Sequence, residues 1–532
     1  MGTLWYNGNI YTMKKEGEKV EAVFTKNGKV IETGSLHVLK EKYQSHRFKQ
    51  EDLKGATMIP GLVDSHMHLI GYGEKLLRLD LSKMTSKQQV LDAIKERAEI
   101  TSTNEWIIGE GWNENLWSPP EVIVREELDA IAPNHAVLLK RTCRHALVVN
   151  SKALTHASIN EEIQSPVGGV VGRDDHDKLN GVFKDKAQDL IFDALPPVSK
   201  NYLEKALKKA IDSCWSLGLV GVHTEDMSYY GGLQQTYDAF NQVINKEGRP
   251  FKAHLLVHHE VIDEWKSAGH SFLSGEKYLE WGAMKIFADG ALGGRTALLS
   301  HPYNDDPTTN GVAIHSQEEL TNLVKKARSI KLPVAVHVIG DLAFQYTLNA
   351  VKKHPTTELR RDRFIHGQIL RKELINEAKG LPMIIDIQPQ FVTSDFPWVI
   401  DRIGEENMTY NYAWKTLLSE GIVCAGGSDS PIEEVNPLLG IYAAVSRQVK
   451  VNGDFVTFQP EERLSRFEAI SLYTKGSAIA AHHELNRGII EEGYEADFTI
   501  FVEDPFTVNV NDLPQLTVFM TVVDEEIVFR KN

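Results

Sequence analysis

The stretch "MIPGLVDSHMHLIG", residues 58–71, is an apolar run that ends on two histidines separated by one residue. Residues i and i+2 of a β-strand point to the same side. His66 and His68 therefore face together, and Asp64 shares their face one step earlier, where it can orient a histidine. A lone His-x-His pattern is weak evidence for a metal site. The rest of the chain decides whether this pair binds a metal or only ends a buried strand.

Strand-like runs that end in polar residues recur along the chain and predict its fold. Including the first, we count eight: "GLVDSHMH", "GLVGVHTED", "FKAHLLVHH", "AMKIFADG", "PVAVHVIGD", "RFIHGQ", "MIIDIQPQ" and "GIVCAGGSDSP". Helices separate several of them. Residues 202–218 place an apolar stripe on one helix face and stop at Gly218, and residues 316–333 open with a Ser316–Glu319 capping box. Eight strand–helix units predict a (β/α)8 TIM barrel, whose chemistry lies where the strands end.

The two ends of the chain have a different, strand-rich texture. Residues 3–35 contain two Asn-Gly pairs, Asn7-Gly8 and Asn27-Gly28, which favour tight hairpins. The C-terminal segment alternates in the same way. We therefore predict a small β-sandwich domain built from residues 1–57 and 485–532, with the barrel formed by residues 58–71 and 200–484.

The segment between the first and second barrel strands is too long for a loop. Residues 72–199 contain their own strand and helix patterns, so we predict an inserted α+β subdomain over the mouth of the barrel. Trp106 is expected to pack in the core of this insert. For Trp112 and Trp117, which lie in a polar loop, core packing and substrate contact remain equally open.

Composition excludes several classes of protein. The 532-residue chain carries 58 basic and 73 acidic residues, a net charge of −15, with no long basic run. Nucleic acid or an anionic membrane is therefore not the expected partner, since phosphate binding needs clustered Lys and Arg. Three dispersed cysteines suggest neither a disulfide framework nor a thiolate site. Without a signal-peptide pattern or a membrane span, we expect a cytoplasmic protein.

Metal-ligand residues recur at the ends of other predicted strands. His337 ends "PVAVHVIGD", His366 ends "RFIHGQ" and Asp429 ends "GIVCAGGSDSP". Structural histidines in a core would not return at this one level. Together with His66 and His68 they give four imidazoles and a carboxylate on one rim, a donor set suited to zinc or a similar divalent ion.

Lys285, inside the predicted fourth strand, has two interpretations. A buried lysine ordinarily needs an ion-pair partner, and Asp289, four residues on, is the obvious candidate. Alternatively, the amine reacts with carbon dioxide to form a carbamate that bridges two metal ions as a carboxylate does. The strand position favours the carbamate.

These motifs resemble the amidohydrolase superfamily, in its family 3 branch of YtcJ-like and N-substituted formamide deformylase-like proteins. The resemblance includes "IPGLVDSHMH", "GEGWNEN", "HALVVNSKAL", "KIFADGALGGRTA" and "GYEADFTIF", and it covers nearly the whole chain. It implies that His66, His68, Lys285 and Asp429 bind one metal and that Lys285, His337 and His366 bind the other. The family's usual Asp-Gly-His reads Cys143-Arg144-His145 here, so its substrate preference is not carried over.

Further residues are candidates for substrate contact. The resemblance favours His145 as a hydrogen-bond donor to the developing oxyanion, although a structural role in the insert is equally open. Trp112, Asp289 and His223, which lies at the end of the second predicted strand, complete the substrate-binding candidates.

The function expected is hydrolysis of a non-peptide carbon–nitrogen bond, most simply in an amide or N-formyl amine. Two divalent ions, zinc or else Mn, Fe or Co, would activate water, with Asp429 as general base and then general acid. The alternatives are a mononuclear aminohydrolase that deaminates a heterocycle and a metal-free assembly protein. The expected partner is a small-molecule substrate, and a homodimer is the candidate assembly.

Overall fold

The computed structural model describes residues 2–44, 47–103, 105–114, 117–141, 146–196, 198–356, 360–451 and 453–531. Its contacts divide the chain into two compact units. The first comprises Met1–Gly71 and Leu203–Asn532, and the second is Tyr72–Tyr202. The predicted insert thus corresponds to a compact unit with its own contacts, while its place over the barrel mouth stays a prediction.

A parallel sheet of eight successive strands forms the centre of the first unit. In spatial order the strands are β6 (Leu62–Met67), β13 (Leu219–Thr224), β14 (Lys252–His258), β16 (Leu279–Phe287), β17 (Val334–Val338), β18 (Asp362–His366), β19 (Met383–Ile387) and β20 (Val423–Gly426). Each pairs in parallel with the next. All eight coincide with the runs that the sequence predicts.

The segment after β20 joins the last strand to the first. The Asp429 amide donates to the His66 carbonyl, and the His68 amide donates to the Ser430 carbonyl, both at 2.8 Å. Because these contacts run between the ends of the sheet, the strands close into a barrel. The predicted (β/α)8 architecture is confirmed.

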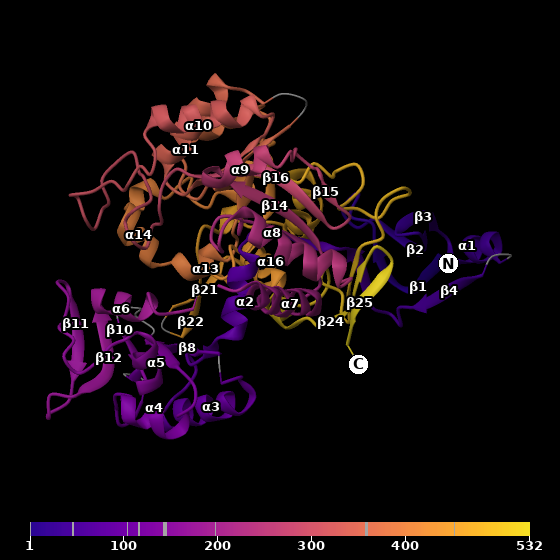
Figure 1. Cartoon of the computed structure of the whole chain (residues 1–532). Coiled ribbons are helices and arrows are strands. Elements are labelled where there is room, and N and C mark those ends of the chain that lie inside the picture. Colours follow the sequence, from indigo (N-terminus) through magenta and orange to yellow (C-terminus); the bar gives the residue numbers. More distant parts are fainter. Residues whose placement is uncertain are drawn as a thin grey trace. The chain divides into compact units, whose positions relative to one another are not determined.

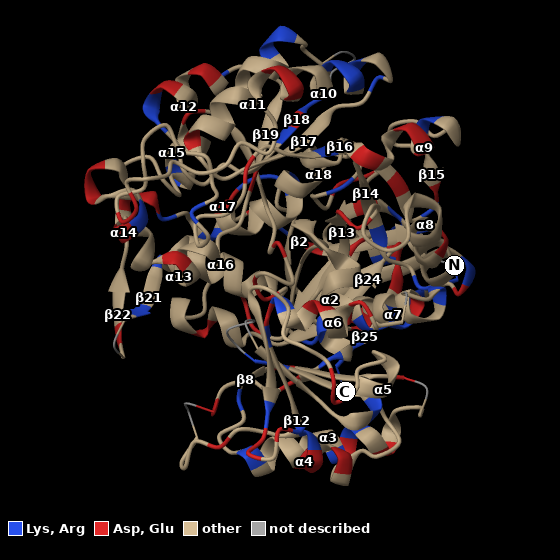
Figure 2. Cartoon of the chain, turned by 60° about the vertical axis from the view of Figure 1, so that its left-hand side comes forward, with Lys and Arg blue, Asp and Glu red and all other residues tan. Residues whose placement is uncertain are grey.

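The barrel strands are flanked by helices, as the sequence predicts. Helix α7 (Lys200–Ser216) buries the stripe of Leu203, Leu207, Ala210, Ile211 and Cys214, and Gly218 follows it with φ +87°. Helix α10 (Gln317–Ser329) begins with the capping box of Ser316 and Glu319. Basic residues (blue) and acidic residues (red) both occur on the outer helices, as on α10 and α12 (Lys372–Ala378) in Figure 2. None of the described helices has the length and apolar character needed to cross a bilayer.

Both ends of the chain contribute to one mixed sheet, as expected. Its order is β25 (Glu526–Arg530), β24 (Val518–Val523), β23 (Phe498–Phe501), β5 (Thr57–Pro60), β1 (Gly2–Tyr11), β2 (Lys19–Lys26) and β3 (Lys29–Gly34), with β4 (Phe48–Asp52) also beside β1. Figure 1 shows the indigo strands of one end and the yellow strands of the other. Alternation sets the two faces of β1: Trp5 packs with Phe498, and Leu4 packs with Phe24 and helix α1 (Leu36–Tyr43).

One predicted hairpin is wrong. Asn27-Gly28 does form the turn between β2 and β3, with φ of +55° and +73°. Asn7-Gly8 instead lies inside β1, at a break in the register with β2. There β1 changes its parallel partner from β4 to β5, and a Cβ on Gly8 would lie 2.4 Å from the Ala56 carbonyl. A bulge in one strand uses the same turn-prone residues as a hairpin.

The second unit is an α+β structure in its own right. Its six strands run in the order β11 (Gly169–Arg173), β12 (Leu179–Asp185), β10 (Ala146–Val149), β9 (Val137–Arg141), β8 (Ile107–Trp112) and β7 (Leu79–Asp80). Helices α3 (Lys87–Ile100), α4 (Arg125–Ile131), α5 (Ser151–His156) and α6 (Asp189–Phe192) lie in the same unit. The predicted class of the insert is confirmed.

Candidate metal centre

All six predicted metal ligands lie within three residues of the C-terminal end of a barrel strand. His66 lies in β6 and His68 directly after it, His337 lies in β17, His366 closes β18, and Asp429 follows β20. Lys285 lies in β16, two residues before the strand ends. Because parallel strands end on one rim, residues separated by up to 363 positions in sequence come together there.

His66, His68 and Asp429 form one cluster. The Asp429 Oδ1 atom lies 3.5 Å from His66 Nε2 and 3.5 Å from His68 Nε2. Their potential ligand atoms all lie within 4.8 Å of one another. Two atoms that bind one zinc ion at about 2.1 Å are separated by about 3.0 to 3.4 Å, so little adjustment would be needed.

Lys285 borders this cluster. Its Nζ atom lies 3.1 Å from His66 Nε2 and 4.7 Å from the centre of the Phe287 ring, and the side chain is fully buried. The alternative partner, Asp289, binds elsewhere: its carboxylate accepts the backbone amides of Leu298, Ile339 and Gly340. The alternative considered for Lys285, an ion pair with Asp289, is therefore not formed, and Lys285 contacts a histidine instead.

His337 and His366 form the second pair. The carbonyl of Gly290 lies 3.1 Å from His337 Nε2, and the side-chain oxygen of Gln388 lies 2.7 Å from His366 Nδ1. Both oxygens accept, so these two ring nitrogens carry the protons. The remaining nitrogens, His337 Nδ1 and His366 Nε2, then turn their lone pairs toward each other at 2.9 Å. Two facing lone pairs in a buried site are stabilised by a cation between them.

His68 is prepared in the same way. The Glu225 carbonyl lies 2.6 Å from His68 Nδ1, so that nitrogen carries the proton and Nε2 is left to face Asp429. Histidine ligands of metals ordinarily donate their second N–H to a carbonyl or carboxylate. In three of the four histidines the donor orientation thus fits a bound divalent ion.

Three of the four histidines are neutral at pH 7, as metal binding requires, whereas His68 must give up a proton. Burial holds the pKa of His66 and His337 well below the ordinary value and lowers that of His366 to about 4, so these rings are neutral at pH 7. Burial alone would lower the pKa of His68, but Asp429 raises it to about 9. Burial acts to raise the pKa of Asp429, but the His68 hydrogen bond together with the charges of His366, His68 and Lys285 lowers it and keeps the carboxylate ionised.

Strained backbone marks two of the ligands. His366 has φ +79° and Asp429 has φ +54°, in the left-handed region that residues other than glycine rarely adopt. Such conformations persist where surrounding contacts enforce them, and they concentrate at functional sites.

Comparison with known proteins agrees with this geometry. The sequence profile of the amidohydrolase family matches residues 49–529. The chain belongs to the amidohydrolase family. It is 51% identical to the amidohydrolase YtcJ of Bacillus subtilis (strain 168) over the full length of both chains, a relative whose name states a family and no substrate. It is 24% identical to the N-substituted formamide deformylase of Arthrobacter pascens, covering 97% of this chain and 96% of that protein.

The match to a solved structure extends the similarity to three dimensions. An uncharacterized metal-dependent hydrolase from Pyrococcus furiosus superposes with a TM-score of 0.80 at 28% identity, covering 95% of this chain and 100% of that one. The protein is accordingly a hydrolase of the metal-dependent amidohydrolase superfamily.

Asp64 orients backbone rather than a histidine ring. Its carboxylate accepts the amides of His66 and Ser428, each at 3.0 Å. It therefore fixes the strand that carries His66 to the segment that carries Asp429. Asp289 acts similarly on the residues that follow His337, and its role in substrate binding stays a prediction.

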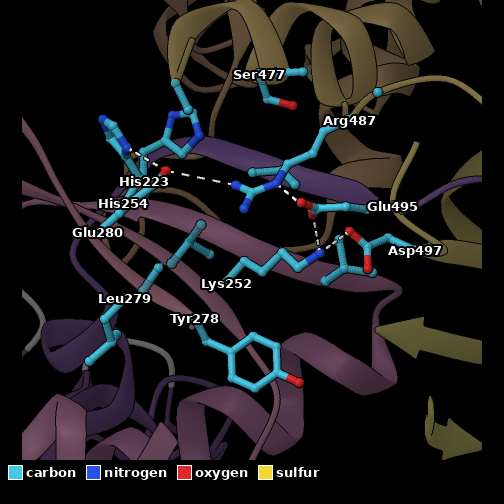
Figure 3. A pocket seen from close by; sticks show the side chains of 18 of the residues that line it. His223, Lys252, His254, Tyr278, Leu279, Glu280, Ser477, Arg487, Glu495 and Asp497 are labelled. Carbon is cyan, nitrogen blue, oxygen red and sulfur yellow. Dashed lines mark hydrogen bonds and ion pairs between the residues drawn. The ribbon is translucent and has the colours of Figure 1, made fainter. Parts of the chain in front are cut away.

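His223 lies in a different cavity from the one expected. It lines a cavity of about 230 Å³ together with Lys252, His254, Glu280 and Arg487 (Figure 3). These residues come from the starts of β14 and β16 and from the segment leading to β23, whereas amidohydrolase chemistry lies at strand ends. A substrate contact by His223 stays a prediction.

The candidates in the insert cannot be placed against the centre. Trp112 is buried and packs with Trp117 and Leu81 in the second unit's own core. Its contact with substrate stays a prediction. His145, with Cys143 and Arg144, lies outside the described residues.

The sequence interpretation missed Glu225 and Gln388, which hold His68 and His366. Both lie in segments already recognised as strand ends, "GLVGVHTED" and "MIIDIQPQ". The signal available was their position directly after a barrel strand. That position alone does not identify a residue that supports a ligand, because a glutamine or a backbone carbonyl carries no pattern comparable to that of a histidine.

Proposed function

We propose that this protein hydrolyses a carbon–nitrogen bond other than a peptide bond, in an amide or N-formyl amine. The observation that carries the proposal is an ionised carboxylate, Asp429, that contacts two ligand histidines at the rim of an amidohydrolase barrel. The name of the Arthrobacter relative, N-substituted formamide deformylase, supports an N-formyl amine in particular. The proposed partner is a small-molecule substrate, and the proposed location of the protein is the cytoplasm.

Two divalent ions would complete the centre, zinc by its donor set, with manganese, iron and cobalt also accepting these ligands. His66, His68 and Asp429 would hold one, and His337 and His366 the other. Burial lowers the pKa of Lys285, which increases the fraction of free amine that can react with carbon dioxide. The proposal therefore includes a Lys285 carbamate shared by both ions.

A divalent ion bound there lowers the pKa of water and polarises a carbonyl oxygen. Asp429 Oδ1, held ionised by His68, takes one proton from the water that adds to the carbonyl carbon. When the carbon–nitrogen bond breaks, Asp429 returns that proton to the departing nitrogen, which leaves as the amine. The carbonyl carbon leaves as the carboxylic acid, which gives its remaining proton to solvent, and Asp429 is again ionised and ready for another cycle.

Substitution of the proposed base tests this mechanism. Asp429→Asn keeps an oxygen for metal binding but cannot accept the proton, so we expect bound metal to persist and kcat to fall about 10²- to 10⁴-fold. The assay is a screen of N-formyl and N-acyl amines, hydantoins and lactams with metal-loaded protein. Asp454→Asn, at an exposed aspartate, is the control. Unchanged turnover by Asp429→Asn would overturn the proposal.

A mononuclear aminohydrolase is the second candidate, favoured by the compact set of His66, His68 and Asp429, which could hold a single ion. Metal analysis separates the two. About two ions per chain supports the bridged centre, and about one supports the mononuclear enzyme and removes the carbamate.

A further inference from the structure

Tyr229 is an exposed aromatic residue beside the centre. It lies five residues after β13, and half of its surface is accessible to solvent. Its ring centre is 6.2 Å from that of His68 and 6.2 Å from that of His258, which ends β14. A large ring exposed beside a predicted ligand histidine is available for contact with a bound molecule.

Glu225 fixes the position of this ring. The Tyr229 hydroxyl donates to Glu225 Oε2 at 2.7 Å, and the same oxygen lies 3.7 Å from His68 Nδ1. The Glu225 side chain is fully buried, and its backbone carbonyl also accepts from His68. One residue therefore holds the ligand and the aromatic ring in a constant relation. Because the hydroxyl is already engaged, Tyr229 presents mainly its ring to a ligand.

Tyr229 begins a row of rings along one side of the centre. From Tyr229 the row passes through His258 to Phe287, whose ring centre is 5.8 Å from that of His258 and 5.2 Å from that of His337. It thus connects His68 of the first ligand cluster with His337 of the second. A molecule whose reacting carbon lies between the clusters would have this row along one flank.

We propose that Tyr229 forms the outer wall of a binding subsite for a planar, apolar group attached to the bond that is cleaved. The subsite rests on the proposed function for the identity of that bond, but its recognition chemistry is independent of it. Offset or edge-to-face contact between two aromatic rings strengthens binding by about twofold to tenfold.

The test compares two hydroxamates, which share a metal-binding group and differ only in the attached substituent. Acetohydroxamate carries a methyl group and benzohydroxamate a phenyl ring. We expect metal-loaded wild-type protein to bind benzohydroxamate about threefold to tenfold more tightly by calorimetry. Tyr229→Ala should reduce this ratio to about one, whereas Tyr229→Phe, which keeps the ring, should retain most of it.

Tyr346→Ala, on helix α11 (Asp341–Lys353), is the control, because it removes a tyrosine outside the row of rings and should leave the ratio unchanged. Metal content, measured for every variant, distinguishes the loss of the Tyr229 ring from damage to the metal centre. Equal affinities in the wild-type protein, or a preference that survives in Tyr229→Ala, would overturn the subsite. Failure of the protein to cleave any amide would overturn the proposed function instead, because hydroxamate binding does not depend on which bond is hydrolysed.

Discussion

At the scale of single residues, the centre depends on which nitrogen of each histidine is protonated. Each of three ring N–H groups donates a hydrogen bond to an oxygen: the carbonyls of Glu225 and Gly290 and the side-chain oxygen of Gln388. In His337 and His366 the opposite nitrogen is thereby left as an acceptor that faces the centre, whereas His68, whose pKa Asp429 raises to about 9, must first release the proton on Nε2. Binding a cation then requires no change of tautomer, which lowers the cost of assembling the site.

Gln388→Ala tests this arrangement. Without the oxygen that accepts from Nδ1, His366 loses the contact that fixes its tautomer and ring orientation. We expect affinity for the divalent ion to fall about 10- to 100-fold, measured by competition with a chelator. Gln390→Ala is the control: Gln390 is also buried and lies two residues away, but it donates to the Glu434 carbonyl. Equal affinity of the two variants would refute the positioning role.

The ligands themselves could be predicted from sequence, whereas their supports could not. His66, His68, His337, His366 and Asp429 recur at one position relative to apolar runs, which is a pattern that a single sequence displays. Gln388 and Gln390 share a segment, and only three-dimensional contacts separate the residue that holds a ligand from the one that holds a loop. Lys285 was placed correctly within a strand, but its contact with His66 crosses 219 positions.

At the scale of elements, local signals predicted helices better than turns. The capping box of α10 predicts where that helix begins because both of its hydrogen bonds lie within four residues. Asn7-Gly8 misled because a hairpin and a bulge need the same local conformation. Strand pairing decides between them, and the partners β4 and β5 lie some fifty residues away in sequence.

Ser316→Ala should weaken the start of α10. The hydroxyl accepts the Glu319 amide, and its loss should destabilise the first helical turn by about 1 kcal/mol. Hydrogen exchange followed by mass spectrometry should show faster exchange in a peptide covering residues 317–321. Ser329→Ala is the control, since that hydroxyl donates to the Lys326 carbonyl at the other end of the helix. Equal exchange in the first turn of both variants would contradict the cap.

At the scale of the whole molecule, an ionic cluster joins the barrel to the β domain within the first unit. Lys252, at the start of β14, contacts the carboxylates of Glu495 and Asp497, and Arg487 also contacts Glu495 (Figure 3). Lys252 contacts the carboxylate of Asp524 as well. The sequence could indicate that both termini build one domain, because both show the same strand-rich, alternating pattern. It could not indicate these pairs, since Lys252 and Glu495 lie 243 positions apart and no periodicity relates them.

This cluster should make the stability of the protein sensitive to acid. Burial acts to raise the pKa of Glu495, but Lys252 and Arg487 lower it to about 2, from an ordinary value of 4.5. A carboxylate whose pKa is lower in the folded state stabilises that state above pH 4.5, and the contribution is lost as the pH falls toward 2. Glu495→Gln should therefore lower the thermal midpoint at pH 7, and the gap from wild type should narrow between about pH 5 and pH 2. Asp497 and Asp524 still neutralise Lys252, so the variant should fold.

Calorimetry across this pH range, with Glu492→Gln as an exposed control in the same segment, measures the gap. A gap that stays constant or widens on acidification would show that the stabilisation of Glu495 does not come from its charge.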